Sequence, residues 1–154
     1  MKSVRQPTRR LAWGCFGYYG RGPIVFVPEG CRLTGQKYRQ LLIKHLSRSF
    51  SKCKRTKRNG VFMHDGAPPH RAKAVQTYLG NKNITLLSPW PPLSPDLNPI
   101  ENVWSYIKKR LENCILANQA QLVAAVTRIW NEVPHSYFKK TCEQHASSCI
   151  VRPF

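Results

Sequence analysis

The chain has 154 residues, 42% of them hydrophobic and 10% aromatic, which predicts one domain with its own buried core. Its 25 Lys and Arg against 7 Asp and Glu give a formal net charge of +18, which indicates a polyanionic partner, with nucleic acid the leading candidate. No apolar run approaches the roughly 18 to 20 residues of a membrane-spanning helix, so we expect no membrane partner.

The first elements have strand patterns, and a helix follows them. Two runs rich in aromatic and β-branched residues, 11–19 and 23–27, flank Gly20-Arg21-Gly22, which predicts a hairpin with a glycine turn. Apolar residues then recur at helical spacing and predict a helix over residues 34–50.

A polar and strongly basic stretch, residues 51–60, follows that helix and is interpreted as a surface loop. Its cations fit a DNA contact, a nuclear-import signal or simply a solvated loop. The candidate nucleic-acid-binding residues of this stretch and of a later helix are Lys52, Lys54, Arg55, Lys57, Arg58, Lys108 and Lys109.

The rest of the chain alternates short strands with helices. The expected elements are a buried strand 61–64, a helix 71–79, a strand 84–87, a stiff proline-rich loop 88–99, amphipathic helices 100–111 and 122–133, and a weaker helix 135–147. This order predicts an α/β domain in which helices pack on a mixed sheet.

Asp65 is the first acidic residue with a distinctive setting. It follows the predicted strand 61–64 and precedes a Gly-Ala-Pro-Pro turn, at the kind of sheet edge where side chains converge on ligands. The alternative is a turn-forming role, since Asp-Gly is the commonest hairpin dipeptide. A helix rather than a returning strand follows the turn, which weakens the turn-forming alternative and leaves both roles open.

Glu101 is the second acidic residue with a distinctive setting. Asn98-Pro99-Ile100-Glu101 fits a helix start with Asn at the N-cap, Pro at N1 and Glu at N3, so capping is one explanation of this carboxylate. The other is a ligand at the mouth of the sheet. Two carboxylates that a fold brings together repel each other unless cations lie between them, and Mg²⁺ or Mn²⁺ suits oxygen ligands of this kind.

Three blocks of the sequence, WGCFGYYGRGPIVF, VFMHDGAPPHRA and LLSPWPPLSPDLNPIENVW, together resemble the successive blocks of the Tc/mariner superfamily of cut-and-paste DNA transposases. The last block is the most specific of the three. The resemblance implies a ribonuclease-H-like mixed sheet flanked by helices, a two-metal site for Mg²⁺ or Mn²⁺, DNA as substrate and a nuclear location.

The resemblance also assigns roles to residues. The family's catalytic, metal-binding Asp and Glu fall on Asp65 and Glu101, with 35 residues between them. His70 matches a family histidine, for which we expect a bracing role in the turn after Asp65. Gly66 departs from the family, which usually has Asn there, and this change is expected to loosen the support of Asp65.

A further departure lies upstream of these blocks. In the family a first catalytic Asp sits on the central first strand of the sheet, whereas Glu29 is the first acidic residue here. We therefore expect a single truncated catalytic domain over residues 1–154, with the first strand missing and no helix-turn-helix DNA-recognition domain. Loss of that strand is expected to leave two unpaired strand edges, and the remaining strands then close up, borrow a strand or associate.

Three functions follow from these expectations. The leading one is a transposase-derived domain that binds DNA but does not transpose alone. The second is an active metal-dependent nuclease or transferase in which another group replaces the missing Asp. The third is a non-catalytic protein that binds nucleic acid, pairs with full-length transposase or itself, and interferes with transposition.

Overall fold

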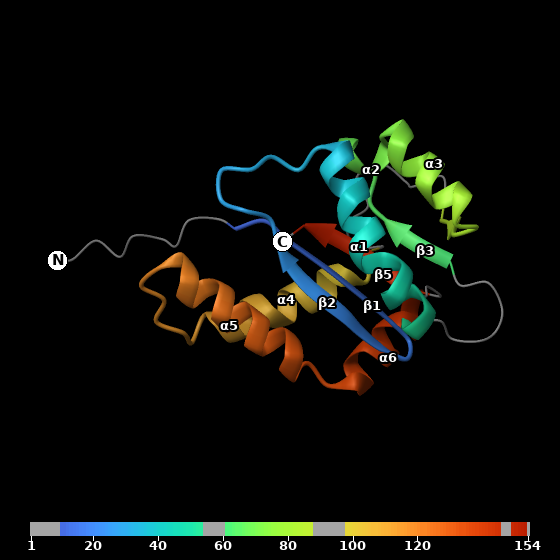
Figure 1. Cartoon of the computed structure of the whole chain (residues 1–154). Helices are drawn as coiled ribbons and strands as arrows, with labels where there is room; N and C mark the ends of the chain where they lie inside the picture. Colours follow the sequence, from blue (N-terminus) through green and yellow to red (C-terminus); the bar gives the residue numbers. More distant parts are fainter. Residues whose placement is uncertain (1–9, 54–60, 88–97, 146–148, 154) are drawn as a thin grey trace.

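The computed structural model describes residues 10–53, 61–87, 98–145 and 149–153. These residues form a five-stranded sheet between two layers of helices (Figure 1). The expected mixed α/β architecture is therefore confirmed. Within the described residues, no helix is long and apolar enough to cross a membrane.

The sheet has the strand order β2-β1-β5-β3-β4. Its strands are β1 (Ala12–Gly17), β2 (Gly20–Phe26), β3 (Val61–His64), β4 (Thr85–Leu86) and β5 (Cys149–Pro153). β1 runs antiparallel to both β2 and β5, whereas β3 runs parallel to both β4 and β5. The sheet is therefore an antiparallel half and a parallel half that meet at β5.

The central strand thus comes from the C-terminal end of the chain. β5 pairs with β1 on one side and with β3 on the other, so it covers the two edges that loss of the first strand was expected to expose. Of the three alternatives, borrowing a strand is the one found, and the borrowed strand belongs to the same chain. No strand was expected at residues 149–153.

One helical layer consists of α1 (Gly35–Cys53), α2 (Pro68–Arg71) and α3 (Lys73–Asn81), and the other of α4 (Ile100–Leu111), α5 (Gln119–Glu132) and α6 (His135–His145) (Figure 1). The helices expected at 34–50, 100–111, 122–133 and 135–147 are confirmed to within a few residues at their ends. The helix expected at 71–79 is interrupted at Ala72, whose backbone is extended (φ −58°, ψ 136°). The N-terminus of α1 packs there, because a Cβ on Gly35 would lie 2.4 Å from Cβ of Ala72.

Strand alternation divides the apolar side chains between two cores. Trp13 and Phe62 face the first layer and pack with Tyr38, Leu42 and Leu46 of α1. Phe16 and Met63 face the second layer, in a cluster with apolar residues of α4, α5 and α6 that include Trp104 and Trp130. Each layer is therefore held to the sheet by its own apolar cluster.

The hairpin turn lies two residues earlier than expected. Gly17 pairs with Gly20, so Tyr18 and Tyr19 form the turn and the Gly-Arg-Gly segment belongs to β2. Gly22 is required for packing instead, because a Cβ at that position would lie 2.3 Å from Sγ of Cys15. The expected loop 88–99 lies outside the described residues up to residue 97.

Gly14 makes room for two tryptophans in the second core. A Cβ at Gly14 would lie 3.0 Å from Cη2 of Trp130 and 3.1 Å from Cη2 of Trp104. We expect Gly14→Ala to lower the free energy of unfolding by about 1 to 3 kcal/mol, because two large rings must shift. Urea denaturation measures this change.

Gly80→Ala is the matched control for that substitution. Gly80 lies in α3, and a Cβ there would meet nothing within 4 Å. An added methyl group in an open helical position is expected to raise stability by up to about 1 kcal/mol. Equal effects of the two substitutions would contradict the packing role of Gly14.

Candidate active site

Asp65 stands directly after the last residue of β3. Its Oδ1 accepts a hydrogen bond from the backbone N–H of Ala67 at 3.0 Å, the side-chain turn expected where a strand gives way to a bend. The side chain is 19% exposed, so one end of the carboxylate is anchored by the turn while the group still reaches solvent.

His70 holds Asp65 from the following helix. Its ring is fully buried, and its Nδ1 lies 2.6 Å from Oδ1 and 3.1 Å from the backbone oxygen of Asp65. A proton on Nδ1 satisfies these acceptors, whereas Nε2 finds no hydrogen-bond partner among the described residues. These contacts agree with the bracing role expected of His70.

Behind this contact lies a buried cluster of three rings, those of Tyr38, His64 and His70. The two imidazoles stack with centroids 4.8 Å apart and planes 11° apart, and Tyr38 lies 4.2 Å from the His70 ring. Oη of Tyr38 and Nδ1 of His64 are 3.0 Å apart. The cluster fixes the end of β3 from which Asp65 projects.

The ionisation of the cluster follows from its burial. Burial, and then the neighbouring His70, lower the pKa of His64 to about 3, against a smaller opposing effect of Asp65. Burial likewise raises the pKa of Tyr38 well above its ordinary value. Near pH 7 both groups are therefore uncharged, and the tautomer of His64 decides which of Oη and Nδ1 donates in their hydrogen bond.

Glu101 lies in the first turn of α4 and is partly exposed. Its backbone N–H donates to the carbonyl of Asn98 at 3.0 Å, and Oδ1 of Asn98 is 3.4 Å from the N–H of Ile100. Asn98 therefore contacts the start of the helix through its carbonyl and its side chain. The N-cap is Pro99, with helical dihedral angles, one residue after the cap expected at Asn98.

The structure brings the segments of the two carboxylates to one side of the sheet. Met63, two residues before Asp65, shares a buried cluster with Ile100, the neighbour of Glu101. α4 also contacts β5, which pairs with β3. Both carboxylates thus stand at ends of elements that pack in one core.

β5, the strand that pairs with β3 next to Asp65, contributes no carboxylate to the candidate site. Val151 of β5 is in register with His64, immediately before Asp65, and the sequence of β5 is Cys-Ile-Val-Arg-Pro. Among the described residues, no three or more His, Cys, Asp or Glu side chains group so as to hold a metal ion. Two carboxylates still fit Mg²⁺ or Mn²⁺, because such ions keep several waters and take phosphate oxygens as further ligands.

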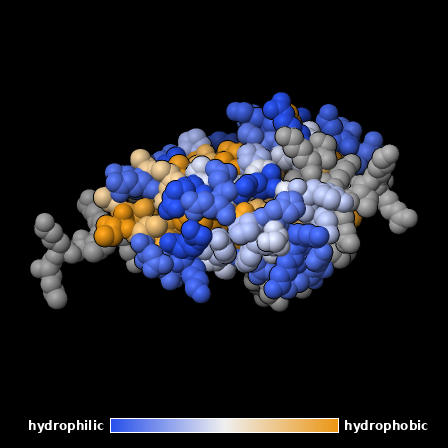
Figure 2. Space-filling model, turned by 90° about the horizontal axis from the view of Figure 1, so that it is seen from below, coloured by the Kyte–Doolittle hydropathy of each residue, from blue (hydrophilic) through white to orange (hydrophobic). Residues whose placement is uncertain are grey.

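The candidate DNA-binding residues are only partly described. Lys52 lies in the last turn of α1, and residues 54–60, with Lys54, Arg55, Lys57 and Arg58, lie outside the described residues. Lys108 and Lys109 are exposed in the last turn of α4. Hydrophilic residues cover much of the face seen in Figure 2, and hydrophobic residues gather towards one end of it.

Sequence reasoning did not identify Tyr38 or His64 as parts of the site. Tyr38 fits the apolar stripe of α1, and His64 ends an apolar strand, so neither has a distinctive local pattern. The only sequence signal is the adjacency of His64 to Asp65. Their contact depends on packing between α1 and β3.

Residues 21–123 match the protein family described as DDE superfamily endonuclease. The chain is 28% identical over 141 residues to the transposable element Tcb1 transposase of Caenorhabditis briggsae, covering 90% of this chain and 49% of that protein. It is 25% identical over 145 residues to the Tc1 transposase of Caenorhabditis elegans, with the same coverage. The chain thus spans about half the length of these relatives.

The fold matches solved transposase structures. The catalytic domain of Mos1 mariner transposase superposes with a TM-score of 0.77 at 20% identity, over 91% of this chain and 71% of that one. The Mos1 paired-end complex with the left transposon end gives a TM-score of 0.77 at 21% identity, over 94% of this chain and 44% of that one. The chain therefore belongs to the DDE superfamily endonucleases and is a Tc/mariner transposase-like domain with a ribonuclease-H-like fold.

Proposed function

We propose that this chain binds DNA in the manner of its family, whose role is DNA cleavage and transposition, and that Asp65 and Glu101 are the carboxylates of its reaction centre. The observation that carries the proposal is the anchoring of Asp65. A carboxylate fixed by Ala67 N–H and by the buried His70 keeps one geometry at the rim of the sheet. A residue that merely formed a turn would not need a buried histidine behind it.

Asp65 and Glu101 would hold Mg²⁺ or Mn²⁺, and structures of Mos1 with each of these ions are among those that the fold matches. When bound, such ions activate a water or hydroxyl for attack on a phosphodiester and stabilise the leaving oxygen. His70 and the turn N–H orient Asp65, and the net charge of +18 draws DNA to the site.

We further propose that these 154 residues do not cut or transpose DNA by themselves. The family resemblance implies three carboxylates, and the strand beside Asp65 supplies none. A full-length transposase or a second copy of the chain is then the partner that completes a site. DNA as substrate, together with the basic residues 52–58, favours the nucleus as location.

The test is nicking and strand transfer on supercoiled DNA with Mg²⁺ or Mn²⁺. We compare the chain with its Asp65→Ala, Glu101→Ala double variant, after circular dichroism has shown that both are folded. The expected result is no nicking by either protein. Nicking by the chain that the double variant loses would show a working two-carboxylate site and overturn the proposal of inactivity.

A second candidate function is non-catalytic DNA binding that interferes with transposition. The observation that favours it is the charge, because only seven acidic residues oppose the cations. A protein that neutralises several phosphates loses affinity steeply as salt rises. Fluorescence anisotropy with a DNA duplex checks this, and absence of binding at low salt would exclude both functions.

A further inference from the structure

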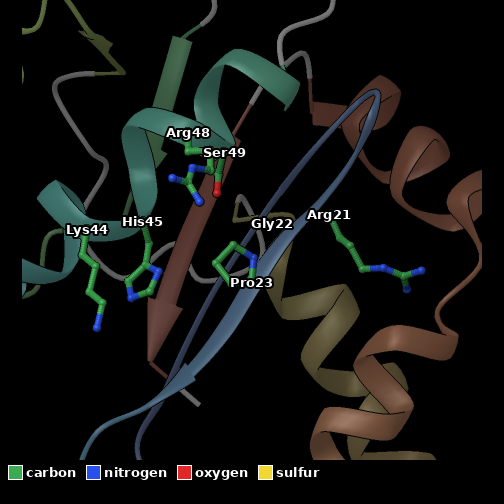
Figure 3. A pocket seen from close by; sticks show the side chains of 7 residues that line it. All are labelled: Arg21, Gly22, Pro23, Lys44, His45, Arg48 and Ser49. Carbon is green, nitrogen blue, oxygen red and sulfur yellow. The ribbon is translucent and has the colours of Figure 1, made fainter.

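A cavity of about 280 Å³ lies between α1 and β2, away from Asp65. Its lining residues are Arg21, Gly22, Pro23, Lys44, His45, Arg48 and Ser49. None of them is acidic. In Figure 3 the side chains of Lys44, His45 and Arg48 project from α1 on the side that faces Gly22 and Pro23, whereas Arg21 extends away from them.

The basic side chains of the cavity have different tasks. The guanidinium of Arg21 donates to the carbonyl oxygens of Trp130 at 2.8 Å and Val133 at 3.2 Å, so it ties β2 to the end of α5. Lys44 and Arg48 are exposed and stand one helical turn apart on α1. Both cations line the cavity at exposed positions.

The floor of the cavity is rigid. Gly22 packs so closely on Cys15 that a Cβ would lie 2.3 Å from its Sγ, and the carbonyl of Gly22 accepts from the indole N–H of Trp130 at 3.1 Å. On the side of α1, Ser49 is 6% exposed. A fixed backbone floor beside two exposed cations suits a small anion, and the volume is below that of typical sites for drug-sized molecules.

We propose that this cavity binds a phosphate group of the DNA backbone, at a site separate from the reaction centre. The proposal rests on the proposed DNA binding and adds a defined contact to it. Tyr38, which touches His64, precedes Lys44 and Arg48 on the same helix, and 1.5 Å per residue places the cavity roughly 9 to 15 Å along α1. Successive phosphates of one strand rise about 3.4 Å along the duplex axis, so DNA at Asp65 reaches the cavity within a few nucleotides.

His45 provides a local readout. Burial, and then the charge of Lys44, lower its pKa, and an anion bound in the cavity opposes both effects by favouring the imidazolium. The His45 ring resonances, followed by NMR against pH, are therefore expected to titrate at higher pH when the cavity is filled. The His45→Gln variant assigns those resonances.

The first arm of the test compares binding of a short DNA duplex across salt concentrations. Lys44→Gln, Arg48→Gln is expected to flatten the slope of log affinity against log salt by about 1, the contribution of one lost phosphate contact. The matched control is Lys82→Gln, Lys140→Gln, which removes the same charge at exposed positions outside the cavity. The control is expected to leave that slope unchanged.

Equal slopes for the two double variants would overturn the proposal while leaving DNA binding intact. Absence of DNA binding by every variant would instead refute the proposed function itself. The second arm adds duplex DNA or inorganic phosphate at equal ionic strength to the wild-type chain. A His45 shift with DNA alone supports a backbone contact, a shift with both supports a general phosphate pocket, and no shift with either overturns the site.

Discussion

Replacing Val151 with proline is expected to abolish the cooperative folding of the chain. Val151 lies in β5, where it pairs with Cys15 of β1 and is in register with His64 of β3. Proline removes a backbone donor, and Val151 has a partner strand on either side, whereas the existing Pro153 is the last residue of β5. A loss of about 3 kcal/mol or more is a large part of the roughly 5 to 15 kcal/mol that stabilises a domain.

The expected loss of stability is large because of the place of β5 in the sheet. In the described part of the chain, β5 is the strand that joins the antiparallel half of the sheet, β2-β1, to the parallel half, β3-β4. When β5 leaves, β1 and β3 each gain an unpaired edge. Asp65, at the end of β3, then loses the neighbour that keeps its strand in place.

Val151→Thr is the control, because it keeps both the backbone N–H and the β-branched shape. It is expected to cost less than about 1 kcal/mol. Urea unfolding followed by circular dichroism and by tryptophan fluorescence measures both variants, since Trp13 and Trp104 report on the two cores. A proline variant that unfolds at the same urea concentration as the wild-type chain would show that β5 does not hold the sheet together.

The sequence predicted those elements whose signals are local. The strand 61–64 is confirmed at both ends because it is a short apolar run bounded by a turn, and α4 begins where Pro99 and the apolar stripe of Ile100 and Val103 predict. β5 was missed because Ile150 and Val151 are its only two large apolar residues and Arg-Pro follows them. Its strand conformation comes from two partners far away in the sequence.

In the candidate site, too, the sequence predicted only the residues that have a local signal. Asp65 and Glu101 could be selected from the sequence because each stands at a recognisable strand end or helix start. The ring cluster could not, since Tyr38 and His64 are 26 residues apart and meet only through tertiary packing. Gly22 misled the turn prediction for the same reason, because its need for glycine arises from contact with Cys15 and not from backbone conformation.

His64 is expected to make the fold strongly sensitive to acid. Its pKa is about 3 in the folded chain, against about 6.5 in an unfolded one, so folding favours the neutral ring. A depressed pKa of this kind contributes stability that is fully present above pH 6.5 and is lost as the pH falls towards 3. The free energy of unfolding should therefore fall by up to about 1.4 kcal/mol per pH unit in this window.

The double variant Tyr38→Phe, His64→Leu isolates this contribution. It removes both partners of the 3.0 Å hydrogen bond, so no buried donor or acceptor of the pair is left unsatisfied, and its stability at pH 7 should stay close to that of the wild-type chain. Tyr38→Phe alone keeps the histidine and is expected to retain the acid sensitivity while losing about 1 to 3 kcal/mol. Urea unfolding at intervals between pH 7 and 4 compares the three proteins. Carboxylates such as Asp65 titrate in all of them, so only the difference in slope reports on His64, and equal slopes for the wild-type chain and the double variant would show that the imidazole is not held neutral by the fold.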